Sequence, residues 1–101
     1  MKMFRVYYVD PDSNVKIYSC NAPGYWAHHC VSPADCVPFD SREDVEKFAE
    51  TEEKYVSPRG KRFIEDYEET RPLAKNKYKG DIVPVAMLRY ITCKESYVPI
   101  V

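Results

Sequence analysis

Residues 2–20 read KMFRVYYVDPDSNVKIYSC, and this stretch predicts a β-hairpin at the start of the fold. Side chains alternate along residues 2–9, which places Phe4, Val6 and Tyr8 on one face of a strand. Residues 10–14 (DPDSN) predict a turn, because proline presets one φ angle and Asp and Asn tolerate tight positions. Residues 15–20 (VKIYSC) then return as the second strand.

Two helices are expected in the middle of the chain. Residues 21–39 predict a long loop, since they hold three prolines and a glycine. Ser41 is the expected cap of a first helix, with an inner stripe of Val45, Phe48, Ala49 and Tyr55. Residues 59–69 predict a second helix, capped by Ser57, opened by Pro58, and facing inward with Phe63, Ile64 and Tyr67.

The remaining residues predict two more strands. Residues 73–80 read as a basic connection, residues 82–93 as a long strand with an edge or bulge at Pro84, and residues 97–101 as a short final strand. The expected class is α+β: a small antiparallel sheet (order β-β-α-α-β-β) with one or two helices packed on one face, in a single domain over residues 1–101. Two open sheet edges suit strand addition by a partner, including a homodimer.

The composition is that of an ordered protein with no strong overall charge. Hydrophobic residues make up 45% of the chain, charged residues 31%, and the net charge is −1. No run approaches the roughly 18 apolar residues of a membrane span, and residues 1–5 lack the apolar core of a signal peptide. We therefore expect a cytoplasmic protein without membrane contact, whose four cysteines are reduced thiols.

A cysteine–histidine segment is the most unusual feature of the sequence. Within residues 20–36 lie four candidate zinc ligands, Cys20, His28, Cys30 and Cys36. Thiolate and imidazole are the donors that zinc prefers, and a metal staple suits a long loop in a small domain. The paired Cys-x2-Cys spacing of common zinc sites is absent, however. Zinc is therefore the alternative, and the main expectation is a protein with no cofactor.

Three other interpretations of these thiols stay open. A disulfide such as Cys30–Cys36 is one, although the expected reducing compartment argues against it. Cys30 as a nucleophile is another, but His29 points away from it on an extended segment, which leaves only His28 as a base. Ordinary buried thiols are the third and favoured interpretation. Paired carboxylates at Glu52-Glu53 and in residues 65–69 are expected on solvent faces, where they do no acid–base chemistry.

Charge is unevenly distributed along the chain. Residues 40–53 hold seven acidic and two basic residues, whereas residues 54–80 hold eight basic and four acidic ones. The basic part of residues 71–79 offers weak nucleic-acid binding as an alternative, with phosphate contacts and base stacking through Lys75, Lys77, Tyr78 and Lys79. The favoured interpretation is two solvated faces that attract each other within the fold.

No catalytic signature or phosphate-binding loop stands out, and we favour a non-enzymatic protein-binding module. Small, motif-poor domains of this kind include phage and mobile-element accessory proteins, among them anti-CRISPR inhibitors of host defence. The analogy rests on small size and the lack of motifs, and no residues are shared with those proteins. Aromatic anchors and acidic side chains suit an interface with a protein partner, so the expected contacts are Tyr25, Trp26, Glu46, Glu50 and Glu53.

Overall fold

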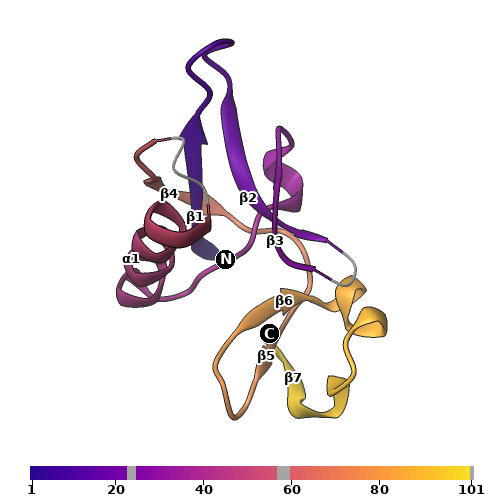
Figure 1. The fold of residues 1–101 in the computed structure, drawn as a ribbon. Helices are drawn as coiled ribbons and strands as arrows, with labels where there is room; N and C mark the ends of the chain where they lie inside the picture. The colour runs from indigo at the N-terminus through magenta and orange to yellow at the C-terminus, as the bar shows by residue number, and fades with distance from the viewer. Residues whose placement is uncertain (23–24, 57–59, 101) are drawn as a thin grey trace.

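Two antiparallel sheets and one α-helix make up the fold in a computed structural model, which describes residues 1–22, 25–56 and 60–100 (Figure 1). The first sheet has the order β3-β2-β1-β4, formed by β1 (Lys2–Val9), β2 (Lys16–Ala22), β3 (Tyr25–Cys30) and β4 (Phe63–Glu68). The second has the order β6-β5-β7, formed by β5 (Leu73–Asn76), β6 (Ile82–Pro84) and β7 (Tyr97–Ile100). Helix α1 (Arg42–Thr51) continues into a π-helical turn, Glu52–Val56. Short 3-10 helices span Pro33–Asp35, Val85–Tyr90 and Lys94–Ser96.

The hairpin and the first helix are confirmed. β1 pairs antiparallel with β2, with Tyr8 opposite Ile17, and Asn14 takes a positive φ of 60° in the turn between them. Ser41 caps α1, since its Oγ accepts a hydrogen bond from the Asp44 backbone N at 3.3 Å. The α+β class, with antiparallel pairing and a helix on one face, is therefore shown, and the additional strands change the element order.

Helix α1 packs on the first sheet through a small apolar core. Val6, Val45 and Ala49 are buried there, and the half-buried side chains around them are Phe4, Phe39, Phe48 and Ile64. The inner stripe expected on this helix is correct up to Ala49. Tyr55 is 75% exposed, contrary to expectation, because Glu52 takes the inward position one turn earlier.

A second core joins the two sheets. Met3 from β1 is fully buried against Leu73 of β5 and Ile82 of β6, and Tyr67 and Ile100 pack around them. Met3 and Val6 lie on opposite faces of β1, so this one strand contributes to both cores. Figure 1 shows α1 beside β1 and β4, with the second sheet as a separate layer near the C-terminus.

The second helix predicted for residues 59–69 is wrong. Residues 63–68 form β4, which pairs antiparallel with β1 from Lys2↔Glu68 to Tyr7↔Phe63. The sequence has the period of a strand here, since Phe63, Glu65 and Tyr67 alternate with Ile64 and Asp66. Phe63 is 40% exposed, so the expected inward face is also partly wrong. The proposed cap Ser57 and Pro58 lie outside the described residues.

Three further segments differ from the sequence-based expectation. Residues 21–39 contain β3, which pairs with β2, and are therefore not one long loop. Residues 73–76 form β5, the central strand of the second sheet, where a basic connection was expected. The long strand expected at residues 82–93 ends at Pro84 and continues as a 3-10 helix. Val85 still donates its backbone N–H to the Pro72 carbonyl oxygen at 2.9 Å, but Pro72 has no N–H to donate in return. The last strand, β7, is confirmed.

Replacing Met3 by alanine tests whether the contact between the sheets carries much of the stability. We expect Met3→Ala to lower the free energy of unfolding by about 2–5 kcal/mol, because it opens a cavity where both sheets meet. Urea unfolding measures the change. Val31→Ala is the control, since Val31 is 65% exposed and its truncation leaves no cavity. Equal small losses in the two variants would contradict a shared core.

Candidate functional site

A groove of about 480 Å³ lies between α1, residues 37–40 and the second sheet with the 3-10 helix that follows it. Its walls are mostly apolar, and the main contributors are Phe39, Phe48, Ile82, Met87, Tyr90 and Ile91. Tyr90 is 49% exposed, so a large ring stands partly in solvent at the side of the groove. The size falls in the range of natural ligand and anchor pockets.

Acidic side chains surround this apolar surface. Asp40, Asp44 and Asp81 line the groove with a single cation, Lys79. Asp40 is already bound to Lys75, whose Nζ lies 3.0 Å from its Oδ2. Asp81 Oδ2 accepts a hydrogen bond from the Tyr97 hydroxyl at 2.5 Å. Burial and then this hydrogen bond raise the pKa of Tyr97 to about 12, so the phenol remains a donor.

A buried charge cluster lies at the other end of α1. The Glu52 carboxylate, whose side chain is 2% exposed, lies 3.4 Å from Nε of Arg62, which is fully enclosed. Ser19 Oγ donates to Glu52 Oε1 at 2.5 Å, and His29 Nε2 lies 3.5 Å from Oε2. The Arg62 guanidinium also stacks over the Tyr8 ring at 4.5 Å. The solvent-facing position expected for Glu52 is wrong, because this pairing compensates for its burial.

Ser19, His29 and Glu52 bring together the groups of a hydrolase triad, but in another arrangement. A triad serine donates to the imidazole, which is in turn held by the carboxylate. Here the serine donates directly to the carboxylate and is only 1% exposed. This cluster therefore pairs charges under the helix, and a substrate would have no access to the buried Ser19 hydroxyl.

Backbone pairing places three of the four proposed zinc ligands, Cys20, Cys30 and Cys36, on neighbouring segments near one end of β2. Cys20 pairs with Cys36 in an isolated antiparallel bridge and with His28 in the β2–β3 ladder, and Cys30 lies two positions further along β3. Burial, followed by hydrogen bonding to the Cys30 thiol, raises the pKa of Cys20 to about 12. All three cysteines are free thiols, and so is Cys93.

The zinc hypothesis stays a prediction, because the side chain of His28 lies outside the described part of the structure. Among the residues that are described, no three His, Cys, Asp or Glu side chains converge in a way that could hold a metal ion. Arg71 Nη2 also lies 3.6 Å from the Cys36 sulfur, where its positive charge opposes a cation.

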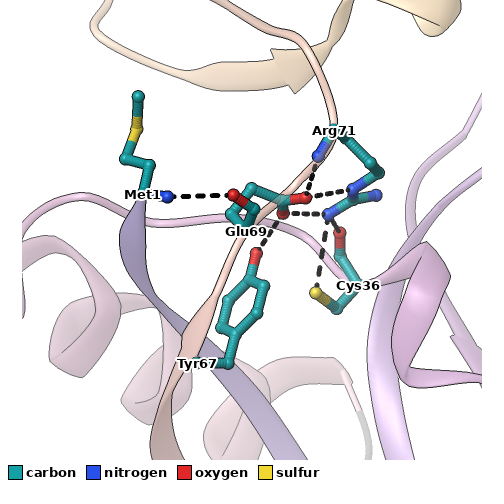
Figure 2. Close-up of polar contacts among 5 residues, drawn as sticks. All are labelled: Met1, Cys36, Tyr67, Glu69 and Arg71. Carbon is teal, nitrogen blue, oxygen red and sulfur yellow. Dashed lines mark hydrogen bonds and ion pairs between the residues drawn. The ribbon is translucent and has the colours of Figure 1, made fainter.

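Glu69 and Arg71 form a bidentate ion pair near these thiols, as Figure 2 shows. Arg71 donates to both carboxylate oxygens, from Nε at 2.8 Å and from Nη2 at 2.6 Å, and Tyr67 donates from its hydroxyl at 2.5 Å. The same guanidinium reaches the Cys36 carbonyl oxygen at 2.8 Å. Burial would raise the pKa of Glu69, but these donors outweigh it and lower that pKa to about 2.

The proposed protein contacts on α1 and its extension lie away from the groove. Glu46, Glu50 and Glu53 are all exposed, and at 3.6 residues per turn they occupy a different stripe from Asp44 and Phe48. Glu46 faces Arg42 at 3.9 Å, and Glu53 Oε1 accepts from the Arg62 backbone N at 2.5 Å. Tyr25 and Trp26 are part of β3, but their side chains are not among those described.

The proposed nucleic-acid residues do not form one continuous basic strip. Lys75 lies in β5 and is paired with Asp40, whereas Lys77, Tyr78 and Lys79 lie in the turn that follows. Tyr78 is 78% exposed, and Lys77 Nζ lies over its ring at 5.4 Å. Lys79 lines the groove beside Asp81. Nucleic-acid binding through this turn remains a prediction.

Known proteins do not assign a function to the groove. Comparison with known proteins found no matching family model, no matching curated protein and no matching solved structure. In the part of the chain that is described, no helix is long and apolar enough to cross a bilayer.

Sequence reasoning missed the groove because its walls come from distant segments. Phe39 and Phe48 pack in the core beneath α1, whereas Ile82 belongs to β6, and Met87 and Tyr90 to the 3-10 helix that follows it. Nothing in their spacing shows that they meet. Glu69 and Arg71 offered a clearer signal, since an acid two residues before an arginine and beside Pro72 suits a tight local ion pair.

The lowered pKa of Glu69 predicts how stability depends on pH. The folded carboxyl has a pKa of about 2, against 4.5 for the unperturbed group, so its contribution is complete above pH 4.5 and is lost as pH falls toward 2. We expect Glu69→Gln to lower the free energy of unfolding near pH 7 by up to about 3 kcal/mol.

Urea unfolding across that pH range checks this expectation. The gap between the wild type and Glu69→Gln should narrow as pH falls through the acidic range. Glu68→Gln is the neighbouring control, because the Glu68 side chain is 65% exposed and surface pairs contribute little. A gap that stays constant down to acidic pH would show that the carboxylate charge is not responsible.

Proposed function

We propose that this chain is a non-catalytic protein-binding module whose groove takes an apolar segment of a partner protein flanked by basic residues. The observation that supports this proposal most directly is the groove itself, in which apolar walls are surrounded by carboxylates. An anchor side chain buried in such a pocket, with charges at its rim, is the usual form of an interface hot spot.

The walls favour a side-chain anchor of the partner. Phe39, Phe48 and Ile82 hold the base of the groove within the two cores, so this surface is formed before any partner binds. Tyr90 and Val85 add exposed apolar surface nearby. A preformed pocket loses little entropy on binding, which favours even a short segment.

The charges at the rim favour a basic partner. Three aspartates and one lysine line the groove, and no described residue forms an ion pair or hydrogen bond with the Asp44 carboxylate. An arginine or lysine beside the anchor would supply that missing partner. Complementary charge of this kind raises the association rate and rejects acidic sequences.

A peptide segment fits the groove better than a metabolite does. Small-molecule sites combine an apolar pocket with several buried polar groups that converge on the ligand. In this groove the carboxylates of Asp40 and Asp81 are already engaged by Lys75 and Tyr97, and Asp44 is at the exposed edge. A wide apolar surface with peripheral charge matches the central core and polar rim of protein interfaces.

We propose inhibition of a host defence protein as one form of this binding. Its support is chemical: proteins that handle nucleic acids carry basic surfaces, and an acidic rim with an apolar anchor site is complementary to them. The acidic stripe of Glu46, Glu50 and Glu53 adds negative charge along the same helix.

Two matched peptides test the groove: a tryptophan flanked by arginines, and the same tryptophan flanked by glutamates. We expect the basic peptide to bind and the acidic one to bind at least about tenfold more weakly, measured by fluorescence anisotropy. Tyr90→Ala and Asp44→Asn should each weaken the basic peptide by about three- to tenfold, since one removes wall surface and the other a rim charge.

Glu43→Gln is the control, because Glu43 is an exposed neighbour of Asp44 that does not line the groove. Its affinity for the basic peptide should equal that of the wild type. Equal binding of the two peptides, or unchanged affinity in both groove variants, would rule out this function for the groove.

A further inference from the structure

Cys20 and Cys36 are backbone partners in a position that suits a disulfide. They face each other in an isolated antiparallel bridge, and the Val37 backbone N donates to the Ser19 carbonyl oxygen at 2.9 Å beside them. This pattern makes them a non-hydrogen-bonded pair, whose Cα atoms lie about 4.5 Å apart in regular sheets. Disulfides span Cα distances of about 4.4–6.8 Å.

A third thiol gives an oxidant access to this pair. Cys20 is 3% exposed and Cys36 is fully buried, whereas Cys30 is half-buried and its thiol donates to the Ser32 carbonyl oxygen at 3.4 Å. Tyr18 pairs with Cys30, and Cys20 follows two residues after Tyr18, so Cys20 and Cys30 share one face of the sheet. Cys20 therefore has Cys36 opposite it and Cys30 diagonal to it, and of these three residues only Cys30 is partly exposed.

A guanidinium stands beside the innermost sulfur. Arg71 Nη2 lies 3.6 Å from Cys36 Sγ, and Glu69 holds this guanidinium in place through two hydrogen bonds (Figure 2). A fixed positive charge stabilises the negative charge that a sulfur carries as it attacks a disulfide. This environment separates Cys36 from an ordinary buried thiol.

We propose that the chain has a thiol-oxidation site in which Cys30 reacts with a peroxide and the oxidation is passed through Cys20 to form a Cys20–Cys36 disulfide. First, the Cys30 sulfur attacks a peroxide oxygen, the O–O bond breaks, and sulfenic acid and water form. Next, Cys20 sulfur attacks the sulfenic sulfur, an S–S bond forms, and the hydroxyl leaves as a second water with the Cys20 proton.

Exchange completes the reaction. Cys36 sulfur attacks the Cys20 sulfur and displaces Cys30, which regains a proton as Cys36 loses one. Overall two thiols lose two protons and two electrons, and one hydrogen peroxide becomes two waters. The new bond closes a loop from residue 20 to residue 36 and fastens residues 37–39, which line the groove, to β2.

Peroxide treatment followed by alkylation and peptide mapping tests the site. The experiment uses the full chain with Cys93→Ser, because the exposed Cys93 would otherwise link two molecules. We expect a Cys20–Cys36 bond with Cys30 alkylated, and a melting temperature about 10 °C higher than that of the reduced protein. Cys30→Ser should slow bond formation at least about tenfold, because it removes the accessible thiol. In Cys36→Ser the bond should stop at Cys20–Cys30.

Two outcomes would overturn the proposal. One is that Cys20 and Cys36 remain fully alkylated after peroxide treatment while Cys30 is oxidised to the sulfonic acid. The other is stoichiometric zinc in the purified protein, protecting all three thiols until a chelator is added. Binding of the basic peptide to the reduced protein is measured separately, so the outcome of either experiment does not decide the other.

Discussion

The whole fold depends on one constraint, which is that β1 is buried on both of its faces. Val6 contacts the core beneath α1, and Met3 contacts the core beneath the second sheet. The same strand pairs with β2 along one edge and with β4 along the other. Side chains alternate with a period of two. A slip of one residue would therefore turn each side chain of β1 to the opposite face and take Met3 and Val6 out of their cores. The register of β1 therefore determines where the helix, the second sheet and the groove between them lie.

Buried ion pairs are the second feature that holds the structure together, beside its two small cores. Glu52 and Arg62 lie under the helix, and Glu69 with Arg71 lies between the sheets. Each carboxylate is held by several donors, among them Ser19 in one cluster and Tyr67 in the other. Removing one member of such a pair leaves an uncompensated charge, which is far more costly than losing a surface ion pair. Such pairs favour one arrangement of the elements over others with similar apolar contact.

Local sequence signals predicted the elements whose stability is local. The β1–β2 hairpin has its turn chemistry in DPDSN, and α1 has its cap in Ser41, so both were found. β4 was misread as a helix because Phe63, Ile64 and Tyr67 also fit helical spacing, and only pairing with β1 decides between the two. Pro84 suggested an edge or a bulge within a long strand, but the strand itself ends there.

The candidate site was less predictable than the fold. The cysteines were singled out from their density in the sequence, but the contact of Cys36 with Arg71 joins residues 35 positions apart. The groove is assembled from both cores, so no single segment carries its pattern. Carboxylates such as Glu52 and Glu69 look like surface residues in sequence, and only their partners show that they are enclosed.

The β1–β4 ladder also has a consequence for how the chain folds. Its closest partners, Tyr7 and Phe63, are separated by more than fifty residues, whereas β2 and β3 are joined to β1 by neighbouring connections. Closing so long a loop is entropically costly and is rewarded only once the ladder forms. We therefore expect the three-stranded meander to assemble early and one edge of β1 to stay open to other chains until β4 pairs with it. The speed of that late closure governs how long the newly made protein is vulnerable to self-association.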